Sequence, residues 1–235
     1  ITVQEQRQQH VQVLHRIMRH NIRNDLTKLR GYVDLLASDT EADTREQRAA
    51  TIRDILDKWE RMATKTQELQ NILTSESALA SHRSARQIVE DIQQQKEDEH
   101  ANANITITAS HDLESQIPSD LDKAISELVE NAITANDTEH PSVHISVSEA
   151  DDRWIEVRVS DTGPGLPDME KDLLETGEET PLSHGQGLGL WMVRSLVTRA
   201  GGSISVDTSG DGSEVTLVVP TQPAREDSEK PGIVS

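Results

Sequence analysis

The segment Asp161-Thr162-Gly163-Pro164-Gly165 directly follows residues 154–159, whose alternating apolar side chains predict a β-strand. A second glycine-rich segment, Gly185-Gln186-Gly187-Leu188-Gly189-Leu190, opens a predicted helix over residues 188–199. Glycine lets a backbone approach a ligand closely, and the free N–H groups of a helix N-terminus bind phosphate. The two segments therefore predict a phosphate-binding site.

The order of these segments excludes two common nucleotide sites. A P-loop requires Gly-Lys-Ser/Thr, which neither segment contains. A Rossmann site requires the glycine-rich turn to follow a strand, whereas the second segment follows a long loop.

A third segment, Glu127-Leu128-Val129-Glu130-Asn131, lies in a predicted helix over residues 121–135. Glu127 and Asn131 are four residues apart and share one helix face, while Leu128 faces the sheet. Carboxylate and amide oxygens suit Mg²⁺. A solvated helix face is the alternative, and for this pair alone it is the commoner explanation.

The N-terminal third predicts two long helices. Apolar residues recur every three or four positions from Val11 to Leu36 and from Ile52 to Leu73, with a polar break over residues 38–43. Two such helices form a hairpin with little to bury against. We therefore expect two copies to build a dimeric four-helix bundle.

His20 is the candidate reactive residue of this hairpin. It lies two residues from both Met18 and Ile22, so it faces away from the apolar stripe. An exposed imidazole near neutral pH is a usable nucleophile, although an ordinary surface histidine is the commoner case.

The sequence after the hairpin predicts an α/β two-layer sandwich. With the helical hairpin before it, the expected fold class of the chain is α+β. Helices are expected over 85–99, 121–135 and 188–199, and strands over 105–108, 143–147, 154–159, 203–206 and 214–219, with a loop over 161–187. We place a helical hairpin domain at 1–76, an α/β domain at 77–220 and a disordered acidic tail at 221–235.

Composition narrows the function classes. The 235 residues carry 42 acidic and 23 basic side chains, a net charge of −19, which disfavours nucleic acid and anionic membrane surfaces as partners. Without cysteine there is neither a disulfide nor a thiol nucleophile.

The sequence has no apolar run of 18 residues, so we expect no membrane contact in this piece and a cytoplasmic location. The acid excess suits a halophilic protein and an ordinary acidic one equally.

Taken in order, these segments resemble the transmitter core of a sensor histidine kinase from a two-component system. Residues 19–26 (Arg-His-Asn-Ile-Arg-Asn-Asp-Leu) resemble the H-box, residues 127–131 the N-box, 161–165 the G1 box and 185–190 the G2 box. The resemblance covers about residues 10–220. It implies a dimeric hairpin followed by a gyrase-like ATPase domain, and the start of the chain resembles the exit from a PAS sensor domain.

The resemblance also implies roles for particular residues. His20 would be the phosphoacceptor, Asn131 (with Glu127) the Mg²⁺ ligand, and Asp161 the acceptor of the adenine amino group. ATP phosphates would lie against Gly163, Gly165, Gly185, Gly187, Leu188 and Gly189, and the 166–184 loop would close over them as a lid. Asn24 matches the position at which phosphatase-competent members carry Thr or Asn.

Several residues depart from the family pattern. Asn21 replaces the acid that usually follows the histidine, and Asp25 replaces a common proline. Thr134 stands where many members have a basic residue, and the phenylalanine-centred F-box is absent. Glu127 replaces an asparagine, and gyrase-like ATPases use a glutamate there as the base for water.

The function implied is an ATP-dependent histidine kinase that autophosphorylates on His20 and passes the phosphoryl group to an aspartate of a response regulator. Two other functions fit the residues that depart from the family pattern. One is an ATP-binding pseudokinase scaffold, and the other is a gyrase-like ATPase that uses Glu127.

Overall fold

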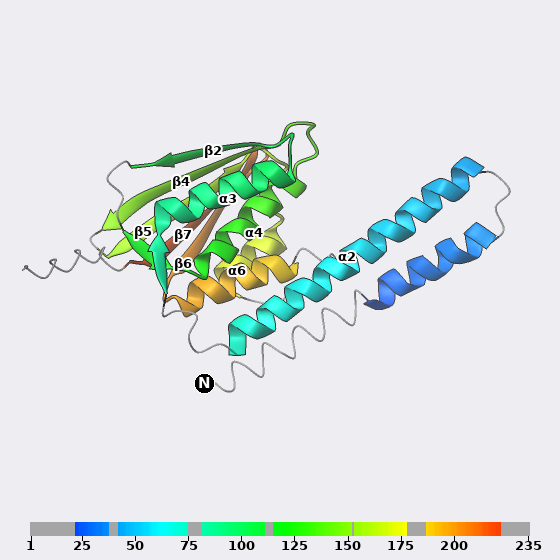
Figure 1. The fold of residues 1–235 in the computed structure, drawn as a ribbon, viewed down its shortest axis with the longest axis horizontal. Coiled ribbons are helices and arrows are strands. Elements are labelled where there is room, and N and C mark those ends of the chain that lie inside the picture. Colours follow the sequence, from blue (N-terminus) through cyan, green and yellow to red (C-terminus); the bar gives the residue numbers. More distant parts are fainter. Residues whose placement is uncertain are drawn as a thin grey trace, which may run out of the picture.

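The computed structural model describes six stretches of the chain: residues 22–37, 42–74, 81–110, 115–151, 153–177 and 187–221. Residues 22–37 are helical, and α2 (Ala42–Thr74) runs back alongside them (Figure 1). These two helices are called the hairpin below. Among the described helices, none combines the length and the apolar character needed to cross a membrane.

The two helices of the hairpin are joined by a buried ion pair. Asp25 is 5% exposed, and its Oδ2 lies 3.2 Å from Nζ of Lys58 on α2. Lys28, one turn further along, is 3.9 Å from the other carboxylate oxygen. The Asp25 carboxylate thus links the first helix of the hairpin to α2.

The α/β part is built on a five-stranded mixed sheet in the order β2-β4-β5-β7-β6. Only β2 and β4 are parallel; the other neighbouring pairs are antiparallel. The strands are β2 (Asn104–Ala109), β4 (Ser142–Asp151), β5 (Trp154–Asp161), β6 (Ser203–Ser209) and β7 (Gly212–Pro220).

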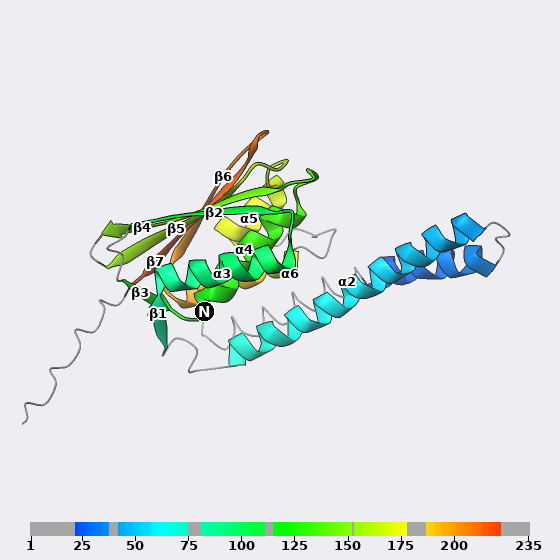
Figure 2. The same ribbon diagram turned by 45° about the horizontal axis from the view of Figure 1, so that its top comes forward.

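Helices cover one face of this sheet, as Figure 2 shows. They are α3 (Ala85–Glu99), α4 (Leu121–Thr134), α5 (Asp168–Glu175) and α6 (Gly187–Arg199). Alternate strand residues and the inner helix faces form the core, in which Ile88, Ile125, Ile145, Ile155 and Leu217 are at most 1% exposed. Burial of these branched side chains supplies the main driving force for folding.

Most expected elements are confirmed, with two corrections. Residues 161–187 were expected as a loop, but α5 occupies 168–175 within them, because Leu173 and Leu174 are buried against the core. A small antiparallel sheet of β1 (His82–Ser84) and β3 (Gln116–Pro118) was also not expected, since both strands have only three residues. The expected tail beyond Thr221 and the junction at residues 75–80 lie outside the described residues, so the domain limits stay a prediction.

Candidate functional site

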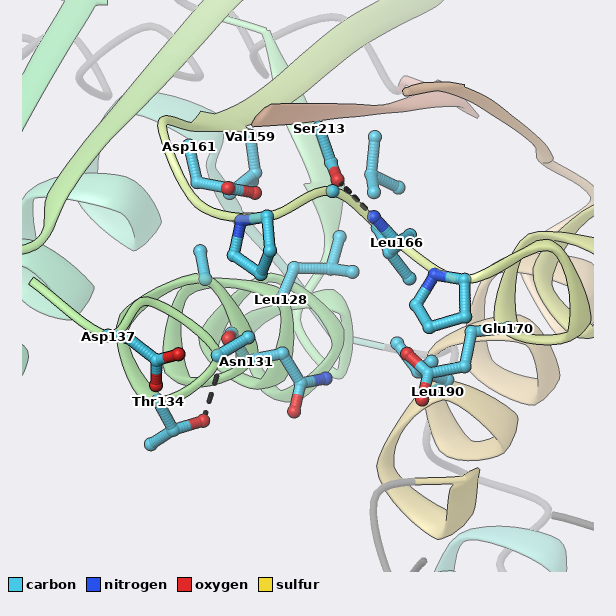
Figure 3. Close-up of a pocket in the computed structure, with 16 residues that line it drawn as sticks. Leu128, Asn131, Thr134, Asp137, Val159, Asp161, Leu166, Glu170, Leu190 and Ser213 are labelled. Carbon is cyan, nitrogen blue, oxygen red and sulfur yellow. Dashed lines mark hydrogen bonds between the residues drawn. The ribbon is translucent and has the colours of Figure 1, made fainter. Parts of the chain in front are cut away.

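A cavity of about 350 Å³ lies between α4 and the loop that follows β5 (Figure 3). Its apolar lining includes Leu128, Ala132, Val159, Leu166, Leu190 and Val215, and its polar lining includes Asn131, Thr134, Asp137, Asp161, Glu170 and Ser213. A mainly apolar slot with a few fixed polar groups is the usual form of a small-molecule site.

Asp161 is the last residue of β5 and is half-buried on the wall of this cavity. Its Oδ1 accepts a hydrogen bond of 2.7 Å from the backbone N–H of Gly163. Burial raises the pKa of Asp161, although backbone hydrogen bonds from Gly163 and Ser213 act in the opposite direction. The carboxylate is therefore held in one orientation and partly desolvated, as a recognition group requires.

The loop after Asp161 is anchored to β6 and β7. Gly165 has φ +84°, and a Cβ there would lie 2.6 Å from the carbonyl oxygen of Ser209, so the position requires glycine. The next N–H, that of Leu166, donates to the hydroxyls of Thr208 at 3.1 Å and Ser213 at 2.7 Å. These contacts fix the shape of the cavity wall.

Asn131 lies on α4, on the wall opposite Asp161 (Figure 3). Its amide nitrogen is buried and has no hydrogen-bond partner among the described residues. A buried donor without an acceptor is costly, so this N–H group fits a site at which an acceptor atom of a ligand completes the hydrogen bonding. The neighbouring Thr134 hydroxyl is used within the helix, donating to the Glu130 carbonyl at 2.8 Å.

Glu127 does not line this cavity. It is 6% exposed, so the solvated helix face considered for this residue is wrong. Its Oε1 lies 2.6 Å from Nζ of Lys65 on α2. Burial raises the pKa of Glu127, and the Lys65 ammonium acts against that shift.

Gly189 explains why the start of α6 comes so close to Glu127. A Cβ at residue 189 would lie 1.8 Å from the Glu127 Oε1, so a larger residue there would displace the Glu127 carboxylate. The side chain of Leu188, beside it, is 4% exposed and packs in the core. Gly187 begins α6.

Of the other predicted residues, only part lies among those that the structure describes. Asn24 is on the hairpin and exposed. His20, Gly185 and the part of the predicted lid over residues 178–184 lie outside the described residues. The structure therefore brings together Asn131, Asp161, Gly163 and Gly165, and it places Glu127 with Gly189 next to them.

The charges around the cavity are unusual for a phosphate ligand. Asp137, Asp161 and Glu170 line it, and none of its described lining residues is Lys or Arg. An anionic ligand here needs a companion cation or backbone N–H donors to offset the three carboxylates.

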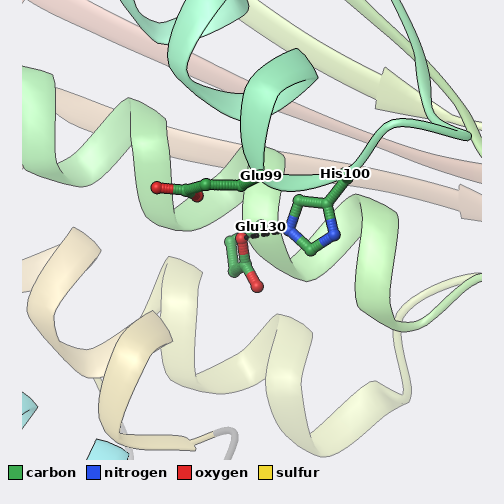
Figure 4. A group of neighbouring side chains, drawn as sticks. All are labelled: Glu99, His100 and Glu130. Carbon is green, nitrogen blue, oxygen red and sulfur yellow. Dashed lines mark hydrogen bonds and ion pairs between the residues drawn. The ribbon is translucent and has the colours of Figure 1, made fainter.

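A separate cluster joins α3 to α4 through Glu99, His100 and Glu130, whose ligand atoms all lie within 4.8 Å of one another (Figure 4). The Lys96 ammonium already lies 2.7 Å from Glu99 and 2.9 Å from Glu130, and the His100 Nε2 lies 3.0 Å from Glu130. Because Lys96 supplies the positive charge, we describe this cluster as an internal ion network.

Three residues that hold the cavity wall or contact Glu127 were not predicted from the sequence. Leu166 and Ser213 have no distinguishing pattern, because they meet only through the register of β5 and β7. Lys65 is one cation among many on a long helix, and nothing in the order of residues pairs it with Glu127.

Residues 116–223 match the family model described as "Histidine kinase-, DNA gyrase B-, and HSP90-like ATPase". The match covers 108 of the 235 residues, and this segment is similar to the ATPase domains of that family. All the residues that line the cavity beside Asp161 lie within this matched segment.

The curated relatives are sensor kinases. The chain is 34% identical to the adaptive-response sensory kinase SasA of Prochlorococcus marinus, over 44% of this chain and 29% of SasA. It is 36% identical to the sensor histidine kinase RcsC of Escherichia coli, over 44% of this chain and 11% of RcsC. MprB of Mycolicibacterium paratuberculosis, a histidine-protein kinase/phosphatase, is 25% identical over 83% of this chain and 39% of MprB. The matched region is thus well under half of each relative.

Solved structures share the fold. Histidine kinase ThkA, in complex with the response regulator protein TrrA, superposes with a TM-score of 0.68 at 19% identity, over 94% of this chain and 66% of that chain. The mycobacterial sensor histidine kinase MprB gives a TM-score of 0.52 at 21% identity, over 61% of this chain and 98% of that chain. At these identities the likeness shows a shared fold.

Proposed function

We propose that this chain is the core of an ATP-dependent histidine kinase, which phosphorylates His20 and passes the phosphoryl group to a response-regulator aspartate. The observation that carries this proposal is the fixed, half-buried Asp161 carboxylate on the wall of an apolar cavity, opposite the unpartnered amide of Asn131.

The adenine of ATP suits the apolar part of the cavity. Its planar ring would lie among Leu128, Val159 and Val215, and its exocyclic amine would donate to Asp161. A site built around one fixed acceptor rejects bases that present a carbonyl at that place, because the buried carboxylate would then lack its partner. This arrangement supports ATP over GTP as the nucleotide.

The phosphates would lie between Asn131 and the first turn of α6. The N–H groups at the start of α6, from Gly187 to Gly189, offer donors for phosphate oxygens. Mg²⁺, held by the Asn131 oxygen, would supply the positive charge that the described lining residues lack.

His20 would then accept the phosphoryl group. A neutral imidazole nitrogen attacks the γ-phosphorus in line, the bond from that phosphorus to the bridging oxygen breaks, and ADP leaves with the electron pair. The second imidazole nitrogen releases its proton to solvent. Because Asn21 replaces the acid that usually follows this histidine, the next side chain in the sequence cannot take that proton, and we expect a slow intrinsic reaction.

A second copy of the chain is the expected partner of the hairpin. Leu26, Val33 and Leu56 are 50–58% exposed in the single chain. An apolar stripe of this kind on a helix pair needs cover from another helix pair, as in a dimeric four-helix bundle. A response regulator and an upstream sensor domain, of PAS type, complete the proposed assembly.

The test is incubation with γ-labelled ATP and Mg²⁺. Wild type should gain acid-labile, base-stable label, and His20→Gln should gain none, whereas the neighbouring His15→Gln should be labelled as wild type. Asp161→Asn should lose nucleotide binding by at least about tenfold while remaining folded, because the adenine amine loses a charged acceptor.

Two results would contradict the proposal. ATP binding without any label on His20 would indicate the pseudokinase scaffold. Phosphate release that survives His20→Gln and is abolished by Glu127→Ala would indicate a gyrase-like ATPase.

A further inference from the structure

The cavity beside Asp161 is lined by negative charge. Asp137, just beyond the end of α4, and Glu170 on α5 line it together with Asp161. In Figure 3, Asn131 lies between Asp137 and Glu170, at the place proposed for the phosphates. Three carboxylates therefore surround a site that is proposed to hold a polyanion.

The lining supplies no cation to offset these carboxylates, since none of its described residues is Lys or Arg. Residues 178–186, which connect the described part of this loop to α6 in the sequence, contain two glutamates and neither Lys nor Arg. Thr134 lines the cavity as an uncharged residue, and its hydroxyl already donates to the Glu130 carbonyl. The local charge thus has the same sign as the net charge of the chain, −19.

Helix dipoles do not reverse this sign. The first turns of α5 and α6 contribute residues to the cavity, and α4 ends there. A helix N-terminus is equivalent to about half a positive charge, and a C-terminus to about half a negative charge. Their sum is about half a positive charge, against the three full negative charges of the carboxylates.

We propose that Asp137 and Glu170 make this cavity selective for a nucleotide whose charge is neutralised by a bound cation, so that metal-free triphosphate is repelled. The nucleoside part is uncharged and binds through the apolar lining and Asp161, whereas the free triphosphate adds several negative charges. A cavity of this volume is roughly 9 Å across, so the lining carboxylates lie within about one Debye length of the ligand at 0.1 M salt. This inference rests on the proposed nucleotide site.

Calorimetric titration without metal tests the selectivity. In EDTA and 0.1 M KCl, adenosine should bind at least about tenfold more tightly than ATP, with AMP and ADP between them, because each phosphate adds charge against the same carboxylates. Mg²⁺ should bring ATP to at least the affinity of adenosine and leave adenosine unchanged. In EDTA and 1 M KCl, where the Debye length is about 3 Å, metal-free ATP should bind at least about fivefold more tightly than at 0.1 M.

Single variants locate the source of the repulsion. Asp137→Asn and Glu170→Gln each remove a lining carboxylate, and Thr134→Lys adds the cation that the lining lacks. The ratio of the ATP to the adenosine dissociation constant in EDTA should fall by about threefold or more in the first two variants and by about tenfold or more in the third. Asp98→Asn is the matched control, because Asp98 is an exposed aspartate of α3 outside the cavity lining, and it should leave the ratio unchanged.

Three outcomes would contradict the proposal in different ways. Metal-free ATP that binds as tightly as adenosine at 0.1 M KCl overturns it, since the N–H donors at the start of α6 would then outweigh the carboxylates. A ratio that stays constant in Asp137→Asn and Glu170→Gln, or that falls equally in Asp98→Asn, overturns the role of these two residues. Failure of both adenosine and Mg²⁺-ATP to bind contradicts the proposed function itself, whereas binding of either leaves the metal-free comparison to decide this inference.

Discussion

Asp161 and Glu127 show how the position of a carboxylate decides its use. Burial raises the pKa of both. Asp161 is oriented by backbone N–H groups and faces a cavity, so it is free to accept a hydrogen bond from a ligand. Glu127 faces a lysine of another element, so its charge serves the contact between the hairpin and the domain.

Glu130, the neighbour of Asn131, gives a test at the level of single residues. Burial alone would raise its pKa, but hydrogen bonds from Lys96 and His100 lower it below the ordinary 4.5. A lowered carboxylate pKa stabilises the fold above the unfolded-state value, and the contribution disappears as pH falls through the folded-state value. Glu130→Gln should therefore lose about 1–2 kcal/mol at pH 7, and the difference from wild type should shrink below pH 4.5.

Urea unfolding at pH 7 and pH 4 measures this difference. The control is Glu97→Gln, an exposed residue of the same helix as Lys96, which should change stability little at either pH. A Glu130→Gln deficit of equal size at both pH values would contradict the ionic explanation.

At the scale of elements, α4 contributes residues both to the cavity and to the contact with the hairpin. On α4, Leu128 packs in the core and Asn131 lines the cavity. Glu127, on the same helix, contacts Lys65 of α2. The hairpin buries Trp59 and Met62 on one side and leaves apolar residues exposed on another. A helix pair with two apolar sides is expected where each side meets a different partner.

The exposed side predicts self-association. Leu26→Glu combined with Val33→Glu should weaken the dimer by about a hundredfold or more, because each charge would have to be buried at the interface in both subunits. Light scattering across a dilution series measures the change. Arg53→Glu, an exposed charge change on α2, is the control, and a double variant that stays dimeric would place the interface elsewhere.

At the scale of the whole molecule, the net charge of −19 opposes the compact state. Raising the salt concentration from 0.1 to 1 M shortens the Debye length from about 10 to about 3 Å and screens this repulsion, although it also weakens exposed ion pairs.

We expect repulsion to dominate, so the melting temperature should rise by roughly 5 °C or more between 0.1 and 2 M KCl. Calorimetry measures the rise, and a parallel series in sucrose separates charge screening from general exclusion of solutes. A melting temperature that stays constant across the KCl series would show that the acidic charge has no net effect on stability.

The segments with strong local patterns were predictable. The strand before Asp161, the glycine at residue 165 and the α4 face with Asn131 each follow from periodicity or from a backbone conformation that only glycine adopts readily. Helix α5 was missed because it is one short helix within a polar, glycine-rich stretch, and its stability comes from burying Leu173 and Leu174 against distant elements.

The order and local pattern of residues alone determined the α+β class, the long helices and the wall of the cavity formed by Asp161 and the glycines, because these depend on side-chain periodicity and backbone sterics between near neighbours. Only the tertiary structure decided that Glu127 pairs with Lys65, that Lys96 fills the cluster around Glu130, and that Leu166 is held by Ser213. These contacts join residues 34 to 62 positions apart, and their energy depends on burial and distance after packing, which no local pattern records.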